Sequence, residues 1–156
     1  MSDKKSLFEA IDAQRAELCS MADQIFDNPE YEGEEVFASG LLTDYLIANG
    51  FDVQMGVGGF KTAFRATYSH GEGGPVLGIL CEYDALRNLG HGCGHHMQGP
   101  GCLGAAVALK NLDTDKPFQL VVYGTPAEET FGSKVQMIQN GCFKELDVAF
   151  MMHGGK

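Results

Sequence analysis

The sequence has few basic residues and no long apolar run. Lys and Arg number 11 against 21 Asp and Glu, which gives a formal net charge of −10 at pH 7. Nucleic acids and anionic membranes bind basic surfaces, so this balance argues against either as a partner. No apolar stretch approaches the ~20 residues that span a bilayer. The N-terminus leads into an amphipathic segment instead of an apolar signal core, and we therefore expect a cytoplasmic protein.

The five cysteines include no Cys-x-x-Cys pair. The sequence therefore lacks the spacing that is typical of thioredoxin-like redox pairs and of zinc ribbons. Thiols remain reduced in the cytoplasm, so any cysteine with a chemical role would act as a thiolate, either as a metal ligand or as a nucleophile. The rest of the composition, with 44% hydrophobic and 21% charged residues in a chain of 156, is typical of one globular domain.

The N-terminal half predicts two helices followed by two strands. Ser6 and Glu9 fit a Ser-x-x-Glu capping box at the start of the first helix, and Asn28-Pro29 is a stop signal after it. Apolar residues recur at helical spacing between these two signals. The predicted elements are a helix over about 6–27, a helix over 34–48, and strands over 51–55 and 60–69 joined by a glycine-rich turn.

From residue 75 onward strands and helices alternate. The predicted elements are strands over 75–81, 118–123 and 147–152, helices over 101–112 and 133–139, and a long loop over roughly 83–98. The first two strands are continuous apolar runs, as expected for strands buried on both faces of a sheet. This alternation predicts an α/β fold with a mostly parallel sheet and right-handed crossovers.

The loop from His91 to His96 is the densest group of metal-ligand residue types in the chain. It holds three imidazoles and a thiol within six residues. Nitrogen and sulfur donors suit zinc, manganese or similar ions, and the flanking glycines let residues two apart turn onto one ion. The same residues would also fit a surface loop rich in histidine, or a cysteine that is buried as a small hydrophobe.

Two further polar groups follow the next two strands. Glu128 and Glu129 come after the strand that ends at Tyr123, and His153 directly follows the strand over 147–152. Adjacent carboxylates commonly mark a solvated helix start, and a lone histidine is commonly structural. Adjacent carboxylates can also divide metal binding and proton transfer between them. Because parallel strands end at the same edge of a sheet, we expect these groups and the histidine-rich loop to meet.

The run from Gly99 to Gly104 matches Gly-x-Gly-x-x-Gly and begins a predicted helix. A dinucleotide site requires a strand immediately before this run, whereas a long loop separates it from Cys81. Tyr123-Gly124 also stands where a ribose-binding acid would be expected. We therefore interpret these glycines as allowing the helix to pack closely on the sheet.

Four short motifs follow one another along the chain. They are Glu82-Tyr83-Asp84-Ala85-Leu86, His91-Gly92-Cys93-Gly94-His95, Gly124-Thr125-Pro126-Ala127-Glu128-Glu129 and Met152-His153. In this order they resemble the M20 metallopeptidase family, and most closely its amidohydrolase branch of aminoacylase-like and p-aminobenzoyl-glutamate hydrolase-like enzymes. The resemblance implies a three-layer αβα sandwich. It also implies that residues 1–156 form the N-terminal portion of the catalytic domain, without the lid domain and the C-terminal segment.

The same resemblance assigns roles to individual residues. It implies two divalent metal ions, zinc or manganese, whose ligands in this chain are Cys93, His95, Glu129 and His153. Glu128 takes the position of the general base, and Asp84 a supporting position beside the ligands. Two positions depart from the family pattern: His96 stands where Asp or Asn is usual, and Arg87 where Pro is common.

The expected function is metal-dependent hydrolysis of an amide bond in a small N-acyl amino acid or a dipeptide-like substrate. A small amide is therefore the expected partner, and a homo-oligomer is compatible with the sequence. The alternative is a catalytically inactive metal-binding fragment or interaction module, because the family's lid and a further histidine ligand would lie beyond Lys156.

Overall fold

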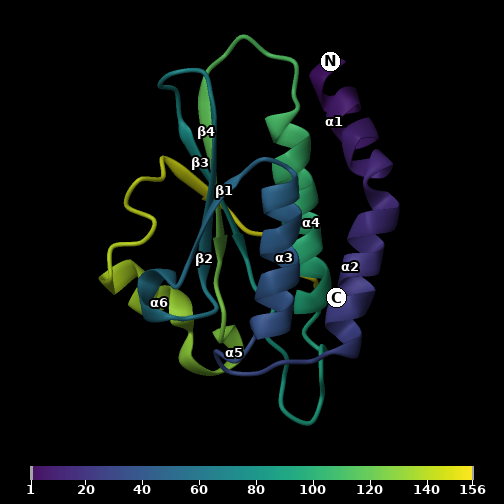
Figure 1. The fold of residues 1–156 in the computed structure, drawn as a ribbon, viewed down its shortest axis with the longest axis vertical. Helices are drawn as coiled ribbons and strands as arrows, with labels where there is room; N and C mark the ends of the chain where they lie inside the picture. Colours follow the sequence, from purple (N-terminus) through teal and green to yellow (C-terminus); the bar gives the residue numbers. More distant parts are fainter. Residues whose placement is uncertain (1, 156) are drawn as a thin grey trace.

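The computed structural model of this chain describes residues 2–155, in which a central sheet separates two layers of helices (Figure 1). The helices are α1 (Ser2–Ala13), α2 (Arg15–Asp27), α3 (Val36–Ala48), η1 (Val57–Gly59, a 3₁₀ turn), α4 (His95–Lys110), α5 (Glu128–Phe131) and α6 (Ser133–Gln139). The strands are β1 (Asp52–Met55), β2 (Phe64–His70), β3 (Val76–Cys81), β4 (Phe118–Gly124) and β5 (Val148–Phe150). Within 2–155, no helix combines the length and the apolar character that a bilayer crossing requires.

The sheet has five strands in the order β1-β2-β4-β3-β5. β3 pairs in parallel with both β4 and β5, whereas β2 pairs antiparallel with both β1 and β4. Among the described strands, β2 alone therefore runs against the other four, which confirms the predicted mostly parallel sheet. The parallel strands at its centre are joined through helices α4, α5 and α6, as parallel pairing requires.

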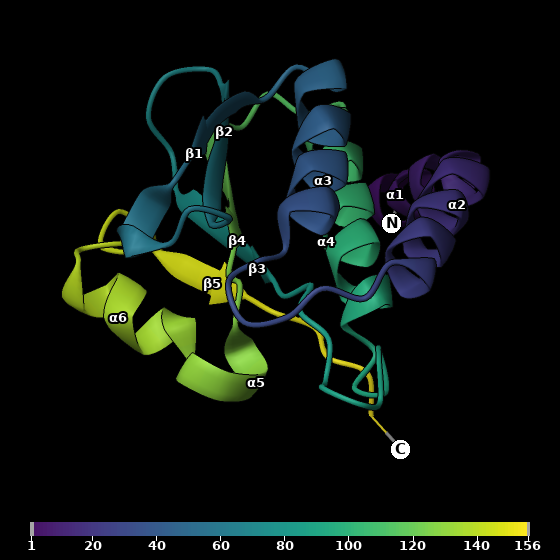
Figure 2. The ribbon, with the colours of Figure 1, turned by 60° about the horizontal axis from the view of Figure 1, so that its bottom comes forward.

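The helices cover both faces of this sheet. α3 and α4 lie against one face and α6 lies on the other, while α2 packs on the outer side of α4 (Figure 2). Successive strand residues point to opposite faces, so Ile79 and Val122 join the core under α3 and α4. Their neighbours Leu80 and Val121 pack with Met137 of α6. The predicted three-layer αβα sandwich is thereby confirmed.

The N-terminal helix predicted over 6–27 is two helices. They meet at Gln14, whose backbone (φ −90°, ψ −5°) departs from regular helix geometry. α1 already begins at Ser2, so Ser6 lies inside the helix and the predicted capping box is wrong. The helix begins before Ser6, on its N-terminal side, because Lys4 and Lys5 are good helix formers. The predicted stop at Asn28 is confirmed, since α2 ends at Asp27.

α4 is the element that differs most from the prediction. It begins at His95 and not near residue 101, so His95 and His96 lie in a helical turn instead of a loop. Gly94, at φ 91°, forms the N-cap, a backbone conformation that glycine adopts without strain. Pro100 lies in the second turn. Glycine and proline locally favour a loop, but burial of most of the helix between its neighbours outweighs that preference.

The glycines of α4 allow close packing, but their main contacts are helices and not the sheet. A Cβ added at Gly99 would come within 3.0 Å of the Leu42 side chain of α3. A Cβ at Gly104 would come within 2.5 Å of the Leu18 side chain of α2. The Gly-x-Gly-x-x-Gly run also lies inside α4 rather than at its start. Its N–H groups are therefore engaged in the helix, which removes the structural basis for a dinucleotide site.

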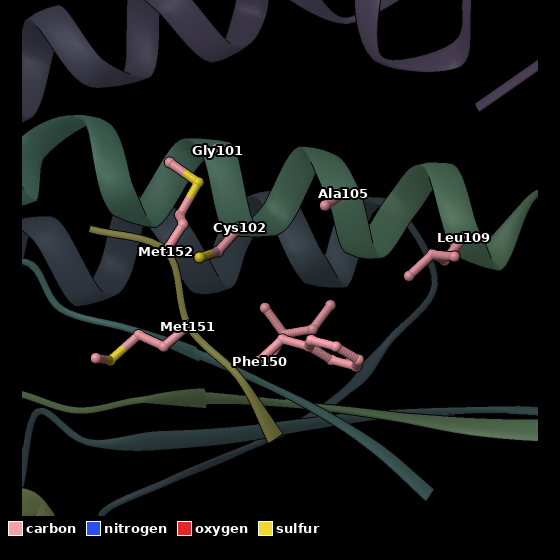
Figure 3. Close-up of a pocket in the computed structure, with 8 residues that line it drawn as sticks. Gly101, Cys102, Ala105, Leu109, Phe150, Met151 and Met152 are labelled. Carbon is pink, nitrogen blue, oxygen red and sulfur yellow. The ribbon is translucent and has the colours of Figure 1, made fainter. Parts of the chain in front are cut away.

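β5 forms one edge of the sheet and carries the chain toward His153. It is shorter than predicted, because Met151 and Met152 lie beyond its last strand residue, Phe150. The side chains of all three are exposed. Figure 3 shows Phe150 and Met152 on the side of this segment that faces α4, across an apolar cavity of about 290 Å³. The cavity is lined by Ile79, Gly101, Cys102, Ala105, Leu109, Phe150, Met151 and Met152.

Candidate metal centre

The predicted site residues meet where β3, β4 and β5 end. Figure 2 shows the loop before α4 and the segment after β5 running side by side at this edge. The Nε2 atom of His153 lies 3.4 Å from Sγ of Cys93 and 3.2 Å from Nε2 of His95. Oε1 of Glu129 lies 3.9 Å from the same His95 nitrogen. The structure therefore brings together all four side chains that were predicted as ligands.

These atoms suit a divalent cation in type and in spacing. The ligand atoms of Cys93, His95 and His153 lie within 4.8 Å of one another, and so do those of His95, Glu128 and Glu129. With zinc–nitrogen and zinc–sulfur bonds of about 2.0–2.3 Å, tetrahedral geometry sets neighbouring ligand atoms roughly 3.3–3.7 Å apart. The contacts of His153 come close to this spacing. His95 belongs to both groups, so the two groups are adjacent in space.

Asp84 holds two of these residues in place. Its Oδ1 lies 3.0 Å from Nδ1 of His95, and its Oδ2 accepts a hydrogen bond from the backbone N–H of Glu129 at 2.9 Å. With Nδ1 engaged by Asp84, Nε2 is the nitrogen that His95 presents to the centre. Burial favours a lower pKa for His95, but the hydrogen bond and charge of Asp84, together with the charge of Glu82, outweigh it and raise the pKa. These contacts match the supporting position predicted for Asp84.

The Cys93 thiol and the Glu129 carboxylate interact at the centre. The hydrogen bond from the Cys93 thiol to the Glu129 carboxylate, followed by burial, raises the pKa of Cys93 to about 12. Oε1 of Glu129 is buried and has no hydrogen-bond partner among the described residues. A cation between the two side chains would displace the thiol proton and satisfy that oxygen.

Glu128 begins α5, a helix of four residues that the sequence patterns did not predict. The preceding residue, Ala127, has a left-handed backbone (φ 53°), which is uncommon for a residue with a Cβ. This turn directs the chain from β4 back across the sheet edge. One Glu128 oxygen thereby lies within 4.8 Å of the ligand atoms of His95 and Glu129.

Glu35 is a residue that sequence reasoning missed. It is fully buried, and its Oε1 accepts hydrogen bonds from the N–H groups of Ala127 at 2.9 Å and Gly33 at 2.8 Å. Its Oε2 accepts the Thr62 hydroxyl at 3.0 Å. Glu35 therefore fixes the left-handed turn that positions Glu128. In the sequence it is one of two acids in the first turn of the helix predicted over 34–48, a pattern that indicates only a favourable helix start. The helix itself begins two residues later than predicted, at Val36.

Replacing Glu35 tests this positioning. Glu35→Ala leaves the N–H groups of Ala127 and Gly33 unpaired, and we expect unfolding free energy to fall by about 3 kcal/mol. Glu35→Gln keeps an acceptor oxygen for both groups, so its loss of unfolding free energy should be clearly smaller. Urea unfolding of the two variants measures the difference. Equal losses in the two would show that these hydrogen bonds do not stabilise the turn.

The other two histidines of the cluster, His91 and His96, lie toward α2. The ring of His96 packs edge-on against Phe26 with centroids 5.0 Å apart, and His91 lies 5.3 Å from His96. Burial, and next the neighbouring His96, lower the pKa of His91 to about 4. The predicted metal-binding loop is thus divided: Cys93 and His95 join the centre, whereas these two histidines pack against a helix.

The lowered pKa of His91 predicts a pH-dependent stability. Between pH 6.5 and about 4 the unfolded chain binds a proton that the folded chain does not. The free energy of unfolding should therefore fall as the pH falls through this window, by up to about 3 kcal/mol from this group. Urea unfolding of metal-free protein at pH 7.5 and 4.5 measures the loss. His91→Gln should reduce it, and an unchanged loss would contradict the assignment.

Residues 81–156 match the family model described as Peptidase family M20/M25/M40. This chain belongs with the M20 peptidases. It is 35% identical over 164 residues to a p-aminobenzoyl-glutamate hydrolase subunit of Escherichia coli (strain K12), covering 93% of this chain and 34% of that protein. It is 38% identical over 163 residues to the Xaa-Arg dipeptidase of Mus musculus, covering 96% of this chain and 38% of that protein. The chain thus spans about a third of the length of these M20 relatives.

Solved structures show the same fold. The Bacillus subtilis YXEP protein, described as a dinuclear metal binding peptidase from the M20 family, superposes with a TM-score of 0.76 at 21% identity, over 92% of this chain and 44% of that one. The aminobenzoyl-glutamate utilization protein from Klebsiella pneumoniae superposes with a TM-score of 0.75 at 20% identity, over 96% of this chain and 46% of that one. At these identities the likeness concerns the fold of the M20 domain.

Proposed function

We propose that this chain supplies the metal centre and the general base of a metal-dependent amidohydrolase. The proposed substrates are small N-acyl amino acids or dipeptide-like amides. The observation that carries the proposal is the convergence of Cys93, His95, Glu129 and His153 at one sheet edge with Glu128 beside them. The names of two relatives, a p-aminobenzoyl-glutamate hydrolase and a dipeptidase, support the substrate class.

Each residue has a distinct task in this reaction. Divalent ions bound by the four ligands would lower the pKa of a water molecule and polarise the substrate carbonyl. Glu128 takes the proton of the attacking water on its carboxylate and delivers it to the leaving nitrogen. Asp84 keeps His95 and the Glu129 backbone at a fixed separation. Glu35 holds the turn that directs Glu128 toward the centre.

We also propose zinc or manganese as the ion, because thiolate, imidazole and carboxylate donors suit both. A cytoplasmic location is proposed as well. All five cysteines are free in the structure, which agrees with a reducing compartment. Fractionation of cells that produce the protein would test that location, and recovery outside the cytoplasm would contradict it.

Metal analysis tests the proposed centre directly. Mass spectrometry of the purified chain, after equilibration with zinc or manganese, should find bound metal, and Cys93→Ser should lose most of it. Cys142→Ser is a matched control, because Cys142 packs in the core beside α6 and not among the ligands. The assignment fails if the unaltered chain binds neither ion, or if both variants lose metal equally.

Activity is measured on the full-length product of the gene that encodes these residues. A panel of N-acyl amino acids and dipeptides should be hydrolysed, and a chelator should abolish the activity. Metal binding without turnover of any amide would instead favour the second candidate, an inactive metal-binding or interaction module. The exposed β5 edge is the observation that favours this candidate, because unpaired edge strands invite association.

A further inference from the structure

Glu82, the residue directly after β3, carries a buried carboxylate with one unsatisfied oxygen. Its side chain is 2% exposed. Oε1 accepts a hydrogen bond from Nζ of Lys134, at the start of α6. Oε2 is buried and has no hydrogen-bond partner among the described residues. A carboxylate that is removed from water with an oxygen unpaired is costly, so a ligand is expected to satisfy that oxygen.

The unsatisfied oxygen faces the metal centre. Oε2 of Glu82 lies 3.3 Å from Nε2 of His95, the nitrogen that His95 presents to the centre. The same nitrogen lies 3.2 Å from Nε2 of His153. The two separations are nearly equal, and both match the roughly 3.3 Å expected between nitrogen or oxygen donors around one ion. Glu82 Oε2 is therefore spaced from His95 as a ligand atom would be.

The ion pair with Lys134 does not by itself explain this arrangement. Buried ion pairs contribute little net stability and can commonly be replaced by apolar residues. The pair does have a use beside a cation site. Lys134 offsets the charge of Glu82, so the carboxylate can offer an oxygen without adding net negative charge next to Cys93 and Glu129. Lys134 also fixes Oε1, which leaves Oε2 as the atom that is available to an ion.

We propose that Glu82 is a further oxygen donor of the metal centre, oriented by Lys134 and binding the ion that His95 binds. The proposal rests on the proposed function, because it assumes that the centre holds a divalent cation. An added carboxylate oxygen favours harder ions. Loss of Glu82 is therefore expected to weaken manganese binding more than zinc binding.

Three variants separate a metal donor from a partner of Lys134. Glu82→Gln removes the charge, Lys134→Met removes the anchor, and the double variant removes the ion pair as a unit and leaves no unpaired buried charge. Competition with a metal-binding indicator measures zinc and manganese affinity. Glu82→Gln and the double variant should lose at least about 10–100-fold in manganese affinity, the range seen for residues that support metal ligands. Lys134→Met retains the donor and should lose less.

The double variant decides the question, because it is the one expected to fold even if Glu82→Gln does not. Circular dichroism and urea unfolding establish that it is folded. Manganese affinity equal to that of the unaltered chain would overturn the proposal and leave Glu82 as the partner of Lys134. A tenfold or greater loss in the folded double variant supports it.

Failure of this inference is distinguishable from failure of the proposed function. If the unaltered chain binds no metal, the proposed function fails and Glu82 has no ion to bind. If Glu129→Gln loses metal while the folded double variant does not, the centre stands and only the role of Glu82 is wrong. Electron paramagnetic resonance of bound manganese gives a second readout, since loss of an oxygen donor alters the spectrum.

Discussion

Glu128→Gln, in the full-length product of the gene, should lower kcat for amide hydrolysis by about 10²–10⁴-fold, the range associated with general acid–base catalysis. The amide side chain has nearly the same shape as the carboxylate but cannot accept the water proton. Metal content should remain unchanged. Steady-state kinetics together with metal analysis of the same preparation measure both quantities.

The alternative role of Glu128 is that of a ligand. One of its oxygens lies within 4.8 Å of the ligand atoms of His95 and Glu129, so this alternative has a geometric basis. Loss of metal in Glu128→Gln would assign it that role and contradict the proposed division between the two glutamates. Glu145→Gln is the control, because Glu145 pairs with Arg65 away from the centre. It should change neither kcat nor metal content.

Loss of the imidazole at position 95 is expected to have the largest effect on metal affinity. Nε2 of His95 is common to both groups of ligand atoms, so His95→Gln removes the donor that lies nearest to all the others. The affinity for zinc should fall by more than the ~100-fold upper range seen for residues that only support ligands. Indicator competition measures the change.

His70→Gln is the matched control for that substitution. The Nε2 atom of His70 lies 2.9 Å from the carbonyl oxygen of Thr114, at the opposite end of the sheet from the centre. This variant should bind zinc as the unaltered chain does. If His95→Gln kept zinc affinity within tenfold of His70→Gln, His95 would not be a ligand of either ion.

The central strands and α6 could be predicted to within a residue or two, because local signals decide them. β3 and β4 are apolar runs between turn residues, and α6 ends at Asn140-Gly141 as predicted. The start of α4 could not be predicted in this way. Gly94 and Pro100 locally indicate a loop, and only the burial of the helix between α2, α3 and the sheet outweighs that signal.

The meeting of the four proposed ligands could be predicted, because it follows from where parallel strands end. The residues that support them could not. Glu35 accepts a hydrogen bond from the backbone of Ala127, which is 92 residues away in the sequence. Lys134 donates one to Glu82, which is 52 residues away. Neither pair has a characteristic spacing or periodicity, since each contact exists only after separate elements have packed. Asp84 was found because it belongs to a motif, but its bond to the Glu129 N–H depends on the fold.

The bonds of Asp84 make one half of the centre rigid and leave the other half adjustable. One carboxyl group sets the positions of both His95 and Glu129, so the distance between these two residues cannot change freely. Cys93 and His153 lie outside helices and strands. A change of ionic radius, as between zinc and manganese, should therefore be absorbed by movement of the thiolate and the second imidazole. Tolerance of different ions would then depend on how far the segments that carry Cys93 and His153 can move, while His95 and Glu129 keep their positions.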